Sequence, residues 1–81
     1  MDEKINEIIL ALQEVEEDNS VPRNVKEKII ITKQILNEET DISIKVSRAL
    51  QSLEELTDDT NMEAFTRSQI FNIVSMLEFL S

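Results

Sequence analysis

Residues 60–80, with the sequence TNMEAFTRSQIFNIVSMLEFL, form the longest amphipathic stretch of the chain and contain all three of its phenylalanines. At about 100° per residue, the rotation of an α-helix, most of its apolar side chains fall on one broad face. That face consists of Met62, Phe65, Gln69, Ile70, Ile73, Met76, Leu77 and Leu80. We predict a helix whose broad face is buried against the other helices. The substitution Phe65→Ala should then cost about 3–5 kcal/mol of stability.

The start of this stretch carries a capping-box pattern, Thr60-Asn61-Met62-Glu63. The Thr60 hydroxyl can accept a hydrogen bond from the backbone N–H of Glu63, and the Glu63 carboxylate can accept one from the N–H of Thr60. The pattern therefore predicts that the last helix begins at about residue 61.

The composition predicts a single all-α domain. The chain has 81 residues, no glycine and one proline, whereas hairpin-rich β folds need turn residues with positive φ. A domain of this size buries only about 60% of its unfolded surface, so the core must be thin. Without glycine, helix ends need another residue in the left-handed conformation, and Asn19 and Asn37 stand where two such ends are expected.

Helical periodicity predicts helices at about residues 2–18, 22–37, 41–57 and 61–80. The predicted buried faces of the first three are Ile5, Ile8, Ile9, Leu12 and Val15; Val25, Ile29, Thr32 and Leu36; and Ile42, Val46, Ala49, Leu50, Leu53 and Leu56. Short connections between helices favour antiparallel neighbours. The sequence therefore predicts an antiparallel up-down-up-down four-helix bundle, and it leaves the handedness of the bundle undetermined.

The charge of the chain favours a protein partner over nucleic acid. The formal net charge is −9, and such a surface repels phosphate backbones and anionic membranes at long range. Half of the basic residues fall in the second predicted helix: Arg23, Lys26, Lys28 and Lys33. We interpret these cations first as partners of acidic groups on neighbouring helices, and only second as a binding patch.

Three features of the sequence predict a cytoplasmic protein with no membrane partner. No apolar run approaches the ~20 residues that a membrane span requires. The chain starts Met1-Asp2-Glu3, which differs from a basic signal peptide. It also contains no cysteine, which agrees with a reducing compartment.

The residue types that most catalytic and metal sites need are missing. The chain has no histidine, no cysteine and no glycine, so it lacks the usual general base, the preferred zinc ligands and the phosphate-binding loops. The segment Asp58-Asp59-Thr60-Asn61 begins like a calcium loop, but no glycine follows and Met62 takes the fifth position. We therefore expect no enzymatic activity, no cofactor and no metal ion.

In the predicted bundle the first and third connections lie at the same end. The candidate interaction site at that end consists of Pro22, Arg23, Asn24, Asn61, Met62 and Arg67. A purely structural explanation also exists, in which Pro22 begins a helix and Asn61 supports a helix cap. In that explanation Arg23 pairs with Asp58 or Asp59.

Some apolar residues lie off the predicted buried faces. Ile30, Ile44, Phe71 and Val74 form the candidate oligomer patch, and Phe79 is a further apolar residue of this kind. Scattered exposed apolar residues are common in soluble proteins. If Phe71 and Val74 join Ile30 or Ile44 in one patch, the chain has a surface for a homodimer or for a partner helix.

Three segments resemble a known family: Ser20-Val21-Pro22-Arg23-Asn24-Val25-Lys26, Asp59-Thr60-Asn61-Met62, and Arg67 ahead of an apolar helix that ends Leu77-Glu78. They are similar to a small family of uncharacterised archaeal proteins, over essentially the whole chain. The Val-Pro-Arg-Asn turn is the most specific element, whereas Glu63 stands where we expect a proline in many relatives. The resemblance implies a small helical bundle of archaeal, cytoplasmic origin and supplies no catalytic residue.

The leading functional hypothesis is a non-enzymatic protein–protein interaction or assembly module, with a protein partner or a second copy of the chain. The alternative is a nucleic-acid-associated accessory protein that uses a local basic patch of Arg23, Lys26, Lys33 and Arg67. A third hypothesis is a small structural protein without a fixed partner.

Overall fold

The structure is a computed structural model that describes residues 3–57 and 62–80. Within those ranges the chain is all-α, with four helices and no strand: α1 (Glu3–Glu17), α2 (Arg23–Leu36), α3 (Ile42–Glu54) and α4 (Ala64–Leu80). The last helix therefore begins at Ala64, where the N–H of Arg67 donates to the carbonyl of Glu63 over 2.9 Å. The predicted capping box involves Thr60, which lies outside the described residues.

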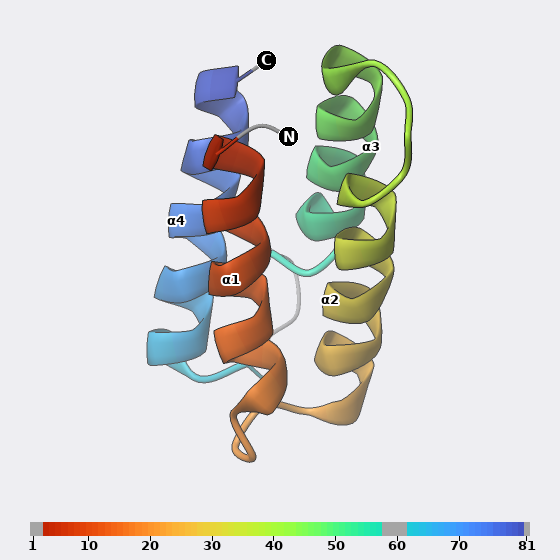
Figure 1. Ribbon diagram of the computed structural model, residues 1–81. Coiled ribbons are helices and arrows are strands. Elements are labelled where there is room, and N and C mark those ends of the chain that lie inside the picture. The colour runs from red at the N-terminus through yellow and green to blue at the C-terminus, as the bar shows by residue number, and fades with distance from the viewer. Residues whose placement is uncertain (1–2, 58–61, 81) are drawn as a thin grey trace.

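The helices pack in a ring. α1 contacts α2 and α4, and α3 also contacts α2 and α4, whereas the diagonal pairs make no contact in the described part of the chain. In Figure 1 the colour ramp runs down α1, up α2, down α3 and up α4, so the start of α1 and the end of α4 lie at one end. Outward-facing side chains on diagonal helices therefore point to opposite sides of the molecule.

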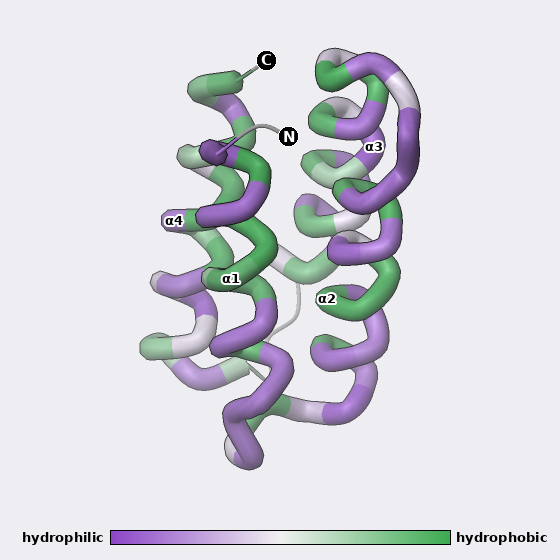
Figure 2. The backbone as a smooth tube through the Cα atoms, in the orientation of Figure 1, coloured by the Kyte–Doolittle hydropathy of each residue, from purple (hydrophilic) through white to green (hydrophobic). Residues whose placement is uncertain are grey.

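One apolar core runs through the middle of the ring and receives side chains from every helix. Its buried members on the helices include Ile5, Ile8, Leu12, Val15, Val25, Ile29, Ile35, Leu36, Val46, Ala49, Leu53, Ile70, Ile73 and Leu77. In Figure 2 hydrophobic and hydrophilic segments alternate along each helix, as expected for helices with one buried face. The centre of each predicted buried face is confirmed.

The end of the ring near the α1–α2 turn is closed by residues outside the helices. α3 is short, and the chain beyond it buries Leu56 and Met62, while the α1–α2 turn buries Val21. Met62 is only 6% exposed, so it is a core residue rather than part of an accessible interaction site. This burial confirms the place of Met62 on the predicted buried face, and it makes Met62 inaccessible to a partner at the predicted interaction site.

The clearest difference from the sequence prediction concerns the aromatic residues of α4. Phe65 is 66% exposed, and Thr66 beside it is buried. Successive helical residues differ by about 100°, so a face centred on Thr66, Ile70 and Leu77 turns Phe65 outward. The predicted burial of Phe65, and the large cost of Phe65→Ala, are therefore wrong.

The edges of the predicted faces are only partly covered. Ile9, Leu50, Met76 and Leu80 are half-buried and pack against the core, and Gln69 is half-buried as well. Ile42 is 38% exposed, although it was predicted to be buried. It is the first residue of α3, and a side chain at the end of a bundle lacks a further turn of neighbours above it.

The helix ends do not use left-handed residues. No described residue other than glycine has positive φ, so the prediction for Asn19 and Asn37 is wrong. Asn37 has φ −88° and ψ −5°. Its backbone N–H donates to the carbonyls of Lys33 and Gln34, and its side-chain amide donates to the Lys33 carbonyl over 3.0 Å. The asparagine thus satisfies the carbonyls of the last turn without leaving the right-handed region.

Candidate functional site

The turn between α1 and α2 is organised by Asp18. Ser20 donates two hydrogen bonds to Asp18 Oδ1, from its backbone N–H over 2.9 Å and from its hydroxyl over 2.7 Å. These bonds hold the pKa of Asp18 below its ordinary value of 3.8, and the bond from the backbone N–H has the largest effect. Nearby Lys26 lowers the pKa further. The N–H of Val21 donates to the Asp18 carbonyl over 3.1 Å. The turn therefore directs Val21 into the core.

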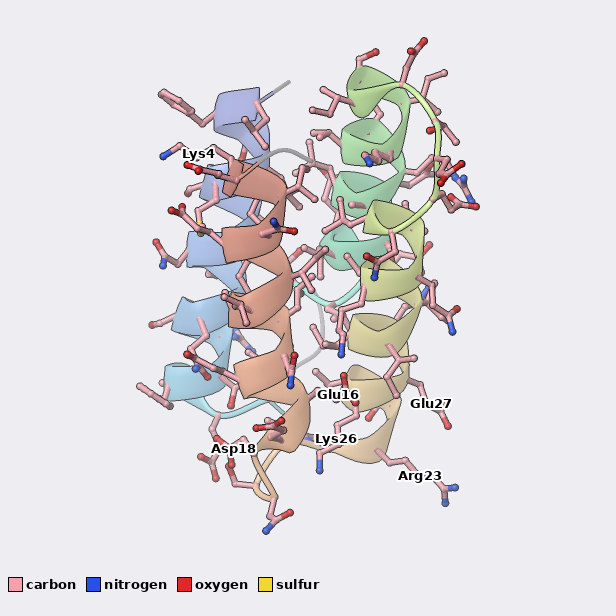
Figure 3. The ribbon with its side chains drawn as sticks, viewed as in Figure 1. Lys4, Glu16, Asp18, Arg23, Lys26 and Glu27 are labelled. Carbon is pink, nitrogen blue, oxygen red and sulfur yellow. The ribbon has the colours of Figure 1, made fainter. Side chains whose placement is uncertain are left out.

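Pro22 stands directly before α2 with φ −59° and ψ 151°, and its carbonyl accepts the first helical hydrogen bond from Lys26 N–H over 3.0 Å. Arg23 follows with a side chain that is 94% exposed and lies 3.8 Å from the Glu27 carboxylate, measured from Nε to Oε1. In Figure 3 Arg23 extends away from the bundle, while Lys26 lies near the turn. Asn61, Asp58 and Asp59 lie outside the described residues, so their predicted roles stay predictions.

A polar cavity of about 350 Å³ lies beside this turn. It is lined by Asn24, Glu27, Lys28, Ile31, Glu55 and Leu56. Lys28 and Glu55 form an ion pair across it, which links α2 to the segment after α3. Of the predicted interaction residues, Asn24 lines this cavity. Its lining mixes paired charges with two apolar side chains, so it does not indicate one class of ligand.

The predicted basic patch is divided by the fold. Arg67 lies on α4, diagonal to α2, which carries Arg23, Lys26 and Lys33. The Arg67 side chain is half-buried, with its Nε atom inside the protein. Lys33 Nζ lies 2.7 Å from Glu16 Oε1 of α1. The structure therefore places Arg67 apart from the cations of α2, and it places one of these in an ion pair.

The candidate oligomer patch is divided in the same way. Ile30 is exposed on α2, Ile44 is exposed on α3, and Phe71 is exposed on α4. Val74 is half-buried and packs against the core. Because α2 and α4 are diagonal, Ile30 cannot share one flat surface with Phe71. The structure therefore separates Ile30 from Phe71, and the alternative in which Ile44 of the neighbouring helix α3 joins Phe71 and Val74 stays a prediction.

An apolar groove lies between α1 and α4. It has a volume of about 310 Å³ and is lined by Lys4, Glu7, Ile8, Ser75, Met76 and Phe79. Phe79 is 82% exposed, and Lys4 Nζ lies 4.0 Å from Glu7 Oε2. Figure 3 shows Lys4 at the start of α1, beside α4. We call this feature the α1–α4 groove.

The α1–α4 groove continues into an uncharged line along the outside of α4. The residues Phe65, Ser68, Asn72, Ser75 and Phe79 are all exposed. Spacings of three and four residues put them on one side of the helix. Since 14 residues rise about 21 Å in a helix, a phenylalanine stands at each end of a line of that length. We call it the α4 outer stripe.

The predicted site did not include this surface. The sequence carried a signal for it, because Phe65 and Phe79 are 14 residues apart and therefore lie on the same side of a helix. The signal was missed because Phe65 was assigned to the buried face. Within the described residues there is also no group of three or more carboxylates that could hold a metal ion, and no helix long and apolar enough to cross a membrane.

The fold and this surface define a class: a small all-α protein that presents an aromatic, uncharged helix face beside an acidic helix. The sequence comparison then assigns the family. The chain belongs to UPF0147, an uncharacterised protein family, whose model matches residues 1–80.

Relatives in archaea share most of the chain. The UPF0147 protein of Sulfurisphaera tokodaii is 36% identical over 76 residues, which cover 93% of this chain and 85% of that protein. The UPF0147 protein of Pyrococcus abyssi is 35% identical over 82 residues, 96% of this chain and 93% of that protein. The crystal structure of a UPF0147 protein from Thermoplasma acidophilum has a TM-score of 0.90 and 32% identity, and covers 96% of this chain and 93% of the other. A crystal structure of a protein of unknown function, MMP1188, has a TM-score of 0.88 and 39% identity, and covers 93% of this chain and 86% of the other.

Proposed function

We propose that the protein is a non-enzymatic protein–protein interaction or assembly module, and that it binds through the α1–α4 groove and the α4 outer stripe. The observation that carries this proposal is the exposure of the two phenylalanines of the α4 outer stripe: Phe65 and Phe79 are 66% and 82% exposed. Aromatic residues are enriched at interfaces between proteins. A chain with a thin core gains stability by burying such side chains, so their exposure needs a reason outside the core.

The chemistry of the groove supports a binding role. Its lining is largely apolar, and its two ionisable side chains, Lys4 and Glu7, lie next to each other. The chain contains no histidine or cysteine to act as a base or nucleophile. We propose accordingly that the protein needs no cofactor and acts in the cytoplasm.

The same proposal includes the finer architecture. The ring of packed helices and the alternating direction of the colour ramp in Figure 1 support an antiparallel up-down-up-down four-helix bundle. In that bundle the outer side of α4 is open to a partner along its length. We also predict that the Val-Pro-Arg-Asn turn at residues 21–24 is typical of the family.

A nucleic-acid-associated role is the second candidate. It is supported by the charge of α2, which has four cations, Arg23, Lys26, Lys28 and Lys33, against the single acid Glu27. Binding to RNA or DNA by these residues would weaken steeply with added salt.

The test is affinity purification of the tagged full-length protein from a lysate of its native source, with and without nuclease. Phe79→Ala is compared with Phe71→Ala, since both remove an exposed phenylalanine from α4 but only Phe79 lines the groove. The proposal expects a protein that survives nuclease treatment and is lost with Phe79→Ala alone. Co-purified proteins that are lost after nuclease treatment support the nucleic-acid-associated role. A partner that co-purifies equally with both variants contradicts the proposed surface.

A further inference from the structure

α1 carries most of the acidity found on the helices. It has five carboxylates, on Glu3, Glu7, Glu14, Glu16 and Glu17, against one cation, Lys4, which gives a net charge of −4. By contrast α4 carries one cation and one acid and is neutral. The negative charge of the chain is therefore concentrated beside the α1–α4 groove and in the loops, and not on the uncharged stripe of α4.

The carboxylates of α1 lie in a line. Glu3, Glu7, Leu10, Glu14 and Glu17 are exposed and follow one another at spacings of four and three residues, so they share one side of the helix. Glu7 lines the α1–α4 groove together with Ser75 and Phe79. The acidic line of α1 and the outer stripe of α4 therefore meet at the α1–α4 groove, where Glu7, Ser75 and Phe79 share one lining.

The acidic line and the α4 outer stripe differ in charge, but they run along two neighbouring helices. The α4 outer stripe spans about 21 Å, which is the length of roughly four helical turns. A partner helix with apolar side chains every three and four residues can place them along such a stripe. Its flanking residues would then face the carboxylates of Glu7 and Glu14, and those positions favour lysine or arginine.

We infer that the α1–α4 groove binds a basic amphipathic helix of a partner protein. Apolar side chains of that helix contact Phe65, Phe79 and the small residues between them, and its cations face Glu7 and Glu14. This inference rests on the proposed function and names the class of partner. The formal net charge of −9 attracts such a helix from a distance and raises its rate of association.

A second copy of the chain fits the groove less well. Each copy carries the same charge of −9, so two copies repel each other at long range. A two-fold pair buries the same surface on both copies. In such a pair the carboxylates of α1 meet either carboxylates or the uncharged stripe, and the one cation of the groove lining, Lys4, already lies next to Glu7.

The test uses two synthetic peptides of roughly 18 residues, about 27 Å as a helix. Both carry leucine at the spacing of the α4 outer stripe; one has lysine at all flanking positions and the other has glutamate. Each is titrated into the isotope-labelled full-length protein, with amide chemical shifts and fluorescence anisotropy as readouts. We expect the lysine peptide to shift amides around Glu7, Ser75 and Phe79, and the glutamate peptide to leave them unchanged.

Variants of the protein sharpen the test. Phe79→Ala should weaken binding of the lysine peptide by at least about tenfold, as expected for an aromatic anchor. The double variant Glu7→Gln/Glu14→Gln should weaken it by roughly threefold to tenfold and reduce its dependence on salt. Phe71→Ala is the matched control and should bind as the unaltered protein does. Because Phe79 is 82% exposed, its variant should fold normally, which a thermal melt checks.

Several results would overturn the inference. These are shifts confined to α2 and α3, equal binding of both peptides, no binding of the lysine peptide, or a Phe79-dependent dimer in sedimentation, which would make a second copy the occupant. The purification experiment separates this failure from that of the proposed function. A nuclease-resistant partner lost with Phe79→Ala, together with an unbound lysine peptide, leaves the interaction module intact and excludes the basic helix.

Discussion

The α2–α3 side and the α1–α4 side of the ring are built differently. Two ion pairs cross the α2–α3 side: Lys28 with Glu55, and Arg48 Nη1 with Glu38 Oε1 over 2.6 Å. Inside the same pair of helices, Thr32 Oγ1 and Ser52 Oγ are 3.0 Å apart. The polar groups of this side are thus largely satisfied within the chain itself.

Both sides expose apolar side chains: Ile30, Ile31 and Ile44 of the α2–α3 side are 40%, 45% and 50% exposed, and the largest exposed fractions belong to α4. Met76 and Phe79 line the α1–α4 groove, and Phe79 and Phe65 stand largely in solvent. The difference is one of kind: the α2–α3 side combines ion pairs with partly exposed isoleucines, whereas α4 carries two largely exposed phenylalanines. Variants on each side test this contrast between the α2–α3 side and the α1–α4 side.

The largest effect should separate the two faces of α4. Leu77 is fully buried, and Leu77→Ala should lower the free energy of unfolding by about 2–5 kcal/mol, through lost burial and the cavity left behind. Phe65→Ala and Phe79→Ala should stay within about 0.5 kcal/mol, since substitutions of exposed side chains remove little packing. Urea denaturation of the three variants gives the comparison. A loss above about 3 kcal/mol for Phe65→Ala would restore Phe65 to the core.

The next effect concerns the buried hydroxyl pair of the α2–α3 side. Thr32 can donate to the Lys28 carbonyl, 2.8 Å away, while Ser52 donates to Thr32. Thr32→Val should cost about 1–3 kcal/mol, because it leaves the buried Ser52 hydroxyl without this partner. The double variant Thr32→Val/Ser52→Ala should recover part of the loss, since both polar groups are then removed. Additive losses in this double-mutant cycle would show that the two hydroxyls are not coupled.

A smaller effect is expected from the surface ion pairs that cross the α2–α3 side. Arg48 and Glu38 are about half exposed, and such pairs contribute about 0.2–1 kcal/mol. Arg48→Met should therefore lower stability by no more than this amount, and the loss should shrink as salt is added. Thermal melts at low and high ionic strength measure both. A loss of several kcal/mol that is insensitive to salt would mean that the pair is part of a buried network.

The smallest effect should come from Asp18 in the α1–α2 turn. Hydrogen bonds from Ser20 lower the pKa of Asp18 from 3.8 in the folded protein, so the unfolded chain binds its proton more tightly than the folded chain does. The stabilisation is present above the ordinary pKa and is lost as pH falls through the folded value. The difference in stability between the protein and Asp18→Asn should therefore shrink on going from about pH 5 to about pH 2. A difference that is constant over this range would exclude the proposed linkage.

The sequence by itself determined the helices and the centre of the core. Spacings of three and four residues fixed the buried faces around Leu12, Ile29, Leu53 and Ile73, because helix periodicity is a local property of the backbone. The absence of glycine excluded turn-rich β folds for an equally local reason. The position of Pro22 at the connection before α2 also followed from local turn chemistry.

Only the tertiary structure decided which edge of each face is covered. The broad stripe of α4 allowed either Phe65 or Thr66 to turn inward, and the choice depended on where α1 and α3 lie against it. The same packing separated Arg67 from the cations of α2 and set Glu7 beside Phe79, which is 72 positions away in the sequence. Whether a residue at the edge of a helix face is buried depends on where the neighbouring helices lie. The periodicity of a helix can be read from its own residues, but the positions of its neighbours are less directly specified by the sequence.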